Sequence, residues 1–312
     1  MKKISFVCPC FNEEGNVEKF YDLINTELST SGFTYEVIFV NDGSTDDTFQ
    51  KLKNIYENNK STVKVVNFVH NFGKDAALLA GLKQAKGDYV CTIDTDLQQD
   101  PIYAIQMANL LENDEKIDMV VAKPEEENTT GLIGFCRKAF YFIINKFSET
   151  EFQNGASDFR VFRQSVCKSI LSLPEHNRFS KGIFSWVSSK IGYIEYDVET
   201  RNSGESKWSN TKLTKYAING IFAFSNLPLY FPFILGVIEL IALSILLIAQ
   251  IVCGIFSVEI NYMARWFVML GLFLASMQSF STSIIAQYIL RIHTETTNRP
   301  IYIIKEILKG DM

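Results

Sequence analysis

The chain has 312 residues, of which 47% are hydrophobic and 21% are charged, and this balance excludes a disordered or fibrous protein. The formal net charge of −5 and the pI of about 5.4 provide no overall basic field, so we do not expect nucleic-acid binding. Six cysteines and three histidines are scattered without the paired spacing of a zinc site or a disulfide framework.

The N-terminal two thirds of the chain alternate strand-like and helical patterns. Apolar runs that end in polar turn residues occur at 4–9, 35–42, 63–69, 88–94 and 118–123. Helical patterns lie between most of these runs, and this rhythm predicts βαβ units with a mainly parallel sheet. Ligands bind beyond the carboxyl ends of such strands. We therefore expect binding residues in the segments 9–14, 41–47 and 94–100.

Two carboxylates separated by one residue, Asp94 and Asp96, follow the fourth predicted strand. Hard oxygen ligands of this kind suit Mg²⁺ or Mn²⁺ held against substrate phosphates. An isolated Asp-x-Asp is common by chance, but the position at a strand end, with Asp42 at a second acidic strand end, favours a metal site. The chain has neither a Gly-x-Gly-x-x-Gly after the first strand nor a P-loop, which argues against dinucleotide redox chemistry and P-loop hydrolysis.

The C-terminal third differs in composition. Residues 232–256 carry one charged side chain, Glu239, and residues 266–290 carry none. Each run is long enough to cross a hydrocarbon core about 30 Å thick. We predict a transmembrane hairpin within 229–291, the alternative being two buried helices. An amphipathic juxtamembrane segment is predicted at 211–228, where a helix packed on the soluble domain is an equal alternative.

Positive residues flank both ends of the predicted hairpin, whereas its linker offers only Arg265. The flanking residues are Lys207, Lys212, Lys215, Arg291, Arg299, Lys305 and Lys309. The positive-inside rule then places residues 1–210 and a tail at 292–312 in the cytoplasm, with the protein in the inner (cytoplasmic) membrane.

Eight segments in order along nearly the whole chain resemble one family. They are CPCFNEEGN, VIFVNDGSTDDT, HNFGKDAALLAGL, GDYVCTIDTDLQQDP, ASDFRVF, LPEHNRFSKGIFSWV, RNSGESKWSNTKL and TNRPIYI. The chain resembles the glycosyltransferase family 2 enzymes that transfer sugar to polyprenyl phosphate, namely the bactoprenol glucosyltransferases and dolichyl-phosphate mannose synthases. The resemblance implies an α/β fold: a GT-A domain, Rossmann-like with a mainly parallel sheet, followed by interfacial helices and the two-helix hairpin.

The activity that the resemblance implies is inverting transfer of a single hexose from a nucleotide sugar to undecaprenyl phosphate. The donor would be UDP-glucose or another UDP-hexose, and the lipid-linked product would serve cell-envelope glycosylation at the cytoplasmic membrane face. The resemblance also implies a homo-oligomer. A phosphate acceptor has a second pKa of about 6 and is largely ionised at neutral pH, so a strong general base is not required.

The resemblance also assigns site residues. The nucleotide would be bound by Pro9, Asn12, Glu13, Asp42, Lys74, Asp94 and Thr95. The metal would be held by Asp94, Asp96 and Gln98. Catalysis would involve Asp158 and Asp96, and the acceptor phosphate would be bound by Arg178, Arg201, Ser206 and Lys207.

Simpler interpretations stay open for several of these residues. Asp42 could serve only as a turn former, Lys74 as a solvated helix start, and Arg178 as a surface charge. Asp158 could orient the acceptor, or pair with a nearby arginine, instead of taking a proton. The chain also departs from the family pattern at Asn41, where Asp is frequent, and at His70 and Lys123, where Arg is usual.

Three other functions compete with this interpretation. A processive polysaccharide synthase of the same fold would show a Gln-x-x-Arg-Trp segment and more membrane crossings than this chain offers. A non-catalytic, membrane-anchored nucleotide-sugar-binding scaffold would not need Asp94, Asp96 and Asp158 together. A phosphatase with an aspartyl nucleophile would place its Asp-x-Asp after the first strand and not after the fourth.

Overall fold

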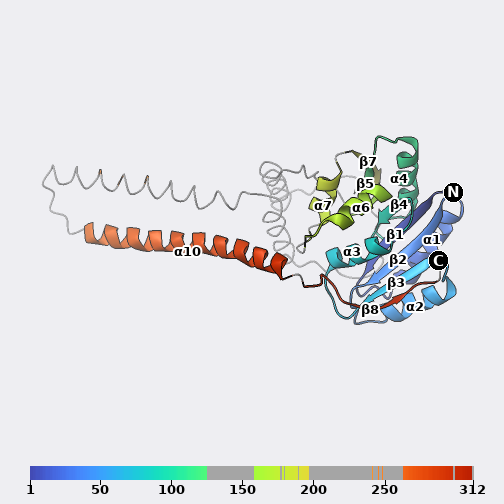
Figure 1. The fold of residues 1–312 in the computed structure, drawn as a ribbon, viewed down its shortest axis with the longest axis horizontal. Helices are drawn as coiled ribbons and strands as arrows, with labels where there is room; N and C mark the ends of the chain where they lie inside the picture. Colours follow the sequence, from blue (N-terminus) through green and yellow to red (C-terminus); the bar gives the residue numbers. More distant parts are fainter. Residues whose placement is uncertain are drawn as a thin grey trace.

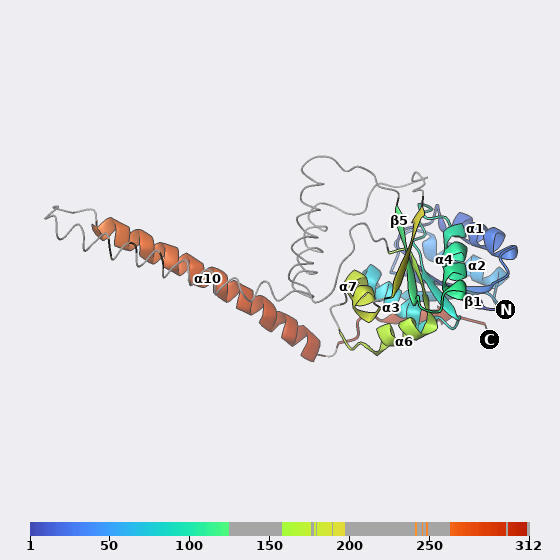
Figure 2. The ribbon, with the colours of Figure 1, turned by 90° about the horizontal axis from the view of Figure 1, so that it is seen from above.

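The computed structural model describes residues 1–124, 158–175, 178, 180–188, 190–196, 241, 245, 248, 263–297 and 299–310. They form a sheet with helices on both faces, and one long helix extends away from it (Figures 1 and 2). The strands are β1 Lys3–Cys10, β2 Thr34–Asn41, β3 Val63–Phe68, β4 Tyr89–Thr92, β5 Met119–Pro124, β6 Arg160–Arg163, β7 Ile191–Tyr196 and β8 Ile304–Leu308. The helices are α1 Val17–Ser29, α2 Thr48–Asn58, α3 Lys74–Gln84, α4 Ile102–Asn113, α6 Gln164–Ser172, α7 Ser180–Val187 and α10 Met263–Thr296.

The sheet confirms the five predicted strands, which are β1 to β5. The eight described strands are ordered β7-β5-β6-β4-β1-β2-β3-β8. Four of the seven pairings are parallel, including those that join β4, β1, β2 and β3. The antiparallel pairings involve β6 and β8. The carboxyl ends of the four central strands therefore meet at one edge, where the site was predicted.

Helices cover the two faces of the sheet and form two apolar cores. On one face, α1, α2 and α4 pack over alternate residues of β1, such as Phe6 and Cys8. On the other face, α3, α6 and α7 pack over residues such as Val7 and Val40. The period of two along each strand sends neighbouring side chains to opposite faces, so both faces of the central strands are apolar.

The end of the chain returns to the sheet after α10. Strand β8, which lies within the segment predicted as a tail, pairs antiparallel with β3 at the sheet edge (Figure 1). Ile301, Tyr302, Ile304 and Ile307 pack against the core beneath α3. These apolar side chains explain why the segment is ordered on the domain.

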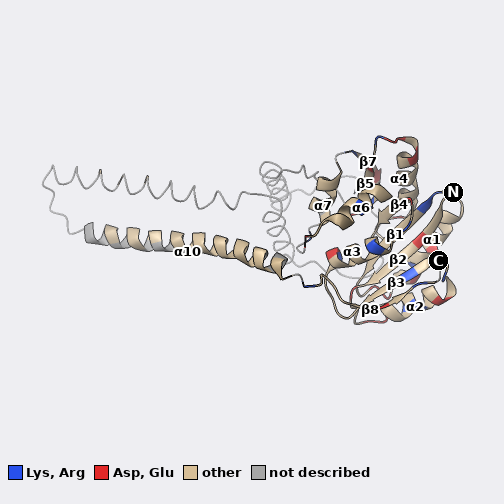
Figure 3. Cartoon of the chain, viewed as in Figure 1, with Lys and Arg blue, Asp and Glu red and all other residues tan. Residues whose placement is uncertain are grey.

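The predicted transmembrane hairpin is not confirmed. Its first crossing, 232–256, lies outside the described residues except for positions 241, 245 and 248. Its second crossing falls within α10, which carries few charged residues, unlike the α/β part (Figure 3). Among the helices that the structure describes, none reaches the length and hydropathy needed to span a membrane. The juxtamembrane segment 211–228 is likewise outside the described residues.

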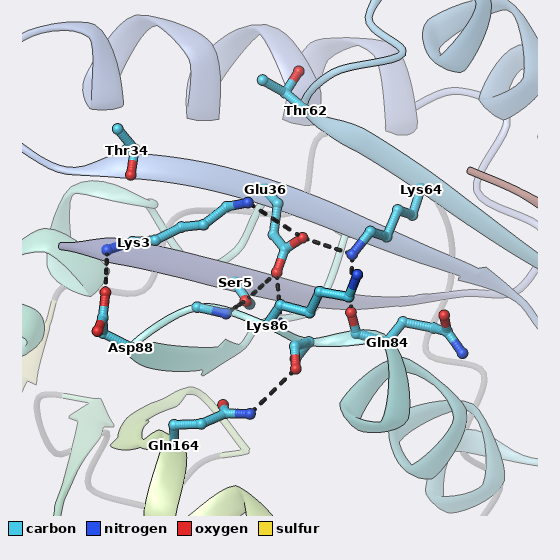
Figure 4. A network of polar contacts seen from close by, with 12 residues as sticks. Lys3, Ser5, Thr34, Glu36, Thr62, Lys64, Gln84, Lys86, Asp88 and Gln164 are labelled. Carbon is cyan, nitrogen blue, oxygen red and sulfur yellow. Dashed lines mark hydrogen bonds and ion pairs between the residues drawn. The ribbon is translucent and has the colours of Figure 1, made fainter. Parts of the chain in front are cut away.

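A buried ion pair between Glu36 and Lys64 links the amino ends of β2 and β3, at the end of the strands opposite the predicted site (Figure 4). Glu36 is fully buried, and its carboxylate accepts hydrogen bonds from the Ser5 hydroxyl at 2.6 Å, Lys64 Nζ at 2.7 Å and the Lys86 N–H at 2.8 Å. Lys64 Nζ also donates to the carbonyl of Gln84, the last residue of α3, at 3.0 Å. Burial alone would raise the pKa of Glu36, but these hydrogen bonds and the Lys64 charge hold it below its usual value.

We predict that Glu36→Gln lowers the free energy of unfolding at neutral pH by about 3 kcal/mol, because it leaves the Lys64 ammonium buried without its counter-charge. Urea denaturation measures the loss. The control is Glu18→Gln, which breaks the exposed Lys51–Glu18 pair and should change stability little. Equal losses in the two variants would contradict this account.

The same pair predicts a pH dependence. Because the pKa of Glu36 is lower in the folded chain, its stabilisation is complete above the unfolded-state value of about 4.3. The stabilisation is lost as the pH falls further, through the folded-state pKa. The wild type should therefore lose more free energy of unfolding on acidification below about pH 4.3 than Glu36→Gln does. Parallel curves for the two proteins would contradict the assignment.

Candidate active site

Two loops at the carboxyl edge of the sheet are bonded into one unit. Asn12, in the loop after β1, has a positive φ of 54°. Its N–H donates to Ser44 Oγ at 3.0 Å, and its Oδ1 accepts from the N–H of Thr45 at 2.9 Å. The N–H of Glu13 donates to Thr48 Oγ1 at 2.8 Å. The predicted nucleotide-binding turn is thus fixed by the loop that follows β2.

Asp42 holds a third loop. Its buried carboxylate accepts from the N–H groups of Phe72 at 2.7 Å and Gly73 at 2.9 Å, and from Asn71 Nδ2 at 3.0 Å. Burial raises the pKa of Asp42, although the two backbone hydrogen bonds oppose this. The observed bonds give Asp42 a role in shaping the loop that leads into α3, and its contact with a nucleoside base stays a prediction.

Lys74 lies between two aspartates that are distant in sequence. It is the first residue of α3, and its Nζ lies 2.7 Å from Oδ1 and 2.8 Å from Oδ2 of Asp94, after β4. The same Nζ lies 2.9 Å from Oδ2 of Asp158, just before β6. The three side chains keep between 25% and 32% of their surface exposed. The predicted catalytic Asp158 and the predicted metal ligand Asp94 therefore share one cation.

Electrostatics at this cluster are dominated by the three charges. Burial alone would lower the pKa of Lys74, but the charges of Asp158 and Asp94 and their hydrogen bonds raise it. Burial raises the pKa of Asp94, as do the charges of Asp158 and Asp96, while Lys74 opposes the rise. Asp96 lies near enough for its charge to act on Asp94, so three carboxylates and one ammonium meet in this region.

The turn after β4 carries the other predicted ligands. The alternating turn residues Asp94, Asp96 and Gln98 are partly exposed, whereas Thr95 is buried and its hydroxyl donates to the carbonyl of Pro9 at 3.4 Å. Among the residues that the structure describes, no group of three or more His, Cys, Asp or Glu side chains is arranged to hold a metal ion. The donor chemistry still fits Mg²⁺ or Mn²⁺, since such ions take one or two carboxylates and complete their shell with water and phosphate.

One residue near the cluster was missed by the sequence analysis. Asp75, the second residue of α3, accepts hydrogen bonds from the N–H and the hydroxyl of Ser180 at the start of α7. This bond ties α7 to the helix end that presents Lys74. The sequence around Asp75 shows only a charged helix start, and nothing in it indicates a partner as distant in sequence as Ser180.

The predicted acceptor residues fall into two groups. Arg178 is half-buried and donates to the carbonyls of Leu173 at 3.1 Å and Ile170 at 2.9 Å, so it caps the end of α6. These bonds show a structural role, and its phosphate contact stays a prediction. Arg201, Ser206 and Lys207 lie outside the described residues.

Comparison with known proteins decides the family. Residues 5–171, more than half of the chain, match the profile described as Glycosyl transferase family 2. The chain belongs to this family. Over 315 residues this family 2 chain is 36% identical to the bactoprenol glucosyl transferase of Shigella phage SfII, covering 99% of each protein. It is 35% identical over 320 residues to the prophage bactoprenol glucosyl transferase homolog of Escherichia coli K12, covering 98% of this chain and 100% of the relative.

A solved structure shares the fold of this family 2 chain. It is glucosyl-3-phosphoglycerate synthase from Mycobacterium tuberculosis, crystallised with Mn²⁺, UDP and glucosyl-3-phosphoglycerate. The TM-score is 0.51 at 21% sequence identity, over 70% of this chain and 77% of the other. The predicted GT-A-like domain with a mainly parallel sheet is therefore confirmed.

A glycine in the loop after β2 provides a test of how tightly these loops pack. We predict that Gly43→Ala destabilises the chain several-fold more than Gly32→Ala in urea denaturation. Both positions have a positive φ, which costs alanine about 1 kcal/mol or slightly more. Only at Gly43 would the added Cβ collide with backbone, 2.3 Å from the carbonyl carbon of His70. Equal losses of unfolding free energy in the two variants would show that the loop around His70 can move to accommodate the added Cβ, and would contradict the prediction.

Proposed function

We propose that this family 2 glycosyltransferase transfers a single hexose from a UDP-sugar to a polyprenyl phosphate such as undecaprenyl phosphate. The observation that carries the proposal is the cluster of Lys74, Asp94 and Asp158 at the carboxyl edge of the sheet. The relatives named bactoprenol glucosyl transferase, aligned over nearly the full chain, support the lipid acceptor and a glucosyl donor. The structural neighbour that binds UDP supports the nucleotide.

The proposed reaction is one displacement at the anomeric carbon. A phosphate oxygen of the acceptor forms the new bond to this carbon, while the bond to the β-phosphate oxygen of UDP breaks and its electron pair leaves with UDP. One displacement inverts the configuration, so an α-linked UDP-sugar yields a β-linked product. Because the acceptor is already ionised at neutral pH, the protein need not remove a proton from it.

Each member of the cluster has a role in this reaction. Lys74 presents an ammonium that stabilises the charge growing on the departing diphosphate. Asp158, whose Oδ2 lies 2.9 Å from Lys74 Nζ, orients the sugar or the acceptor. A divalent ion held by Asp94 and Asp96, with Gln98 nearby, would supply further stabilisation of the leaving diphosphate. Pro9, Asn12, Glu13 and Thr95 would surround the nucleoside.

We place the reaction at the cytoplasmic face of a membrane, because the acceptor is a lipid. Apolar side chains along α10 support this location: Trp266, Phe280 and Ile289 are each more than half exposed. Positive residues flank the segment 229–291 on both sides, which supports a cytoplasmic catalytic domain. Fractionation of cells that express the full chain would test the location, and recovery in the soluble fraction would contradict it. The homo-oligomer stays a prediction.

Membranes that contain the full chain, supplied with UDP-glucose, Mg²⁺ and undecaprenyl phosphate, should form a lipid-linked hexose. We predict that Asp94→Asn, Asp96→Asn or removal of the ion by EDTA lowers this activity at least about a hundredfold, because charge on the departing diphosphate is no longer stabilised. The control is Asp22→Asn, the same chemical change on the exposed face of α1. Full activity in both Asp94 and Asp96 variants would refute the metal assignment, and a water-soluble polymer as product would indicate a synthase.

Lys74 can be tested separately from the metal ligands. We predict that Lys74→Met lowers kcat by about a hundredfold, because a cationic donor at the leaving group is lost. Lys74→Arg keeps the charge and should retain part of the activity. The control is Lys19→Met on the exposed face of α1. A Lys74→Met protein with wild-type kcat would show that Lys74 only holds the two aspartates.

A further inference from the structure

A continuous series of hydrogen bonds joins strand β8 to the loop after β1. Asn67 Nδ2 donates to Glu306 Oε1 at 3.3 Å, and Asn41 Nδ2 donates to Asn67 Oδ1 at 2.8 Å. Ser44 Oγ donates to Asn41 Oδ1 at 2.5 Å, and the N–H of Asn12 donates to Ser44 Oγ at 3.0 Å. The series therefore crosses β3 and β2 and ends at the predicted nucleotide-binding turn.

The hydrogen bonds of this series all run in one donor-to-acceptor direction, and the residues in it determine that direction. The N–H of Ser44 also points to Asn41 Oδ1, at 3.4 Å, and a backbone N–H can only donate. The Asn41 amide must therefore present its oxygen to Ser44 and its nitrogen to Asn67. Asn67 then presents its own nitrogen to Glu306, whose carboxylate only accepts. Asn67 Nδ2 has an acceptor in this arrangement because Glu306 stands at the far end of the series.

Residues Asn41 and Asn67 are almost fully buried, with 2% and 4% of their surface exposed. If a buried amide loses its hydrogen-bond partners, the folded chain is destabilised by about the free energy of the missing hydrogen bonds. Rotation of either amide would set two donors or two acceptors against each other. This series of hydrogen bonds, called the relay below, can therefore form with only one orientation of the two amides. An aspartate at position 41 could not donate to Asn67 Oδ1.

A second contact links the same C-terminal segment to the loop that presents Lys74. The N–H of Val69 donates to the carbonyl of Ile303 at 3.2 Å. The ring of Tyr302 stacks on Phe68, with centroids 5.0 Å apart, and Phe68 in turn meets the edge of Phe72 at 5.7 Å. Phe72 donates its N–H to Asp42 and lies two residues before Lys74. Residues 302–306, in and just before β8, therefore support two of the loops that form the candidate site.

We propose that β8 is part of the nucleotide site, and that Glu306 is a positioning residue for the Asn12 turn. Glu306 acts through Asn67, Asn41 and Ser44, which hold the Asn12 N–H and so the backbone around the nucleoside. The inference rests on the proposed function, because it takes UDP as the ligand of this turn. Its consequence is that nucleotide affinity depends on a segment near the C-terminus, beyond α10.

The experiment measures UDP binding to the purified full chain by calorimetry with Mn²⁺ present, together with KM and kcat for UDP-glucose. We expect Glu306→Ala to raise both the dissociation constant of UDP and KM about five- to tenfold, with kcat nearly unchanged. Glu306→Gln keeps an acceptor oxygen, so its dissociation constant should lie between those of the wild type and Glu306→Ala. The matched control is Lys305→Ala, the neighbouring exposed residue of β8, which should bind UDP as the wild type does.

A double variant separates the relay from general damage to the strand. Asn41→Asp forces Asn67 to turn its oxygen toward Glu306, so it should weaken UDP binding strongly. Removing Glu306 relieves that repulsion, and Asn41→Asp with Glu306→Ala should bind no worse than Asn41→Asp alone. Additive losses would contradict the relay.

Hydrogen exchange of residues 11–14 supplies a readout that does not depend on catalysis. We expect faster exchange of the Asn12 N–H in Glu306→Ala. The inference would be overturned if the wild type binds UDP and Glu306→Ala binds it with the same affinity, with only a lower Tm. That result would leave the proposed function intact. A wild type that binds no UDP would overturn both.

Discussion

The candidate site depends on one ammonium shared by two carboxylates. Asp94 and Asp158 come from different parts of the chain and would repel each other at this separation. Lys74 Nζ, within 3 Å of both, makes their proximity favourable. Together with Asp96, whose charge acts on Asp94, the carboxylates outnumber the single ammonium, and such a set of oxygen ligands suits a divalent ion. The same ammonium lies where the growing charge of a leaving diphosphate can be stabilised.

The rest of the domain holds α3, and so Lys74, in place. At its amino end, the preceding loop is bound by the Asp42 carboxylate, and Asp75 binds the start of α7. At its carboxyl end, the carbonyl of Gln84 accepts from Lys64, which is itself paired with the buried Glu36. Polar interactions at both ends of a helix whose middle is apolar leave its register little freedom. The position of Lys74 therefore follows from contacts at both ends of α3, which lie at the carboxyl and the amino ends of the strands.

The sequence predicted the five strands β1 to β5 because their apolar runs are local and end in turn residues. Strand β6 was missed because Arg160 and Arg163 interrupt its apolar pattern, and β8 was missed because its partner β3 lies far away in sequence. Asp94, Asp96 and Asp158 were identified from their motifs. The motifs could not show that Lys74 lies between Asp94 and Asp158, or that Asp42 binds a loop, because those facts depend on packing between distant segments.

The most direct test of the central claim is a crystal structure of the full chain with UDP and Mn²⁺, in which anomalous scattering locates the manganese. We expect an anomalous peak beside the Asp94 and Asp96 carboxylates, with the diphosphate between the ion and Lys74 Nζ. A diphosphate bound elsewhere, with Lys74 still bridging Asp94 and Asp158, would contradict it.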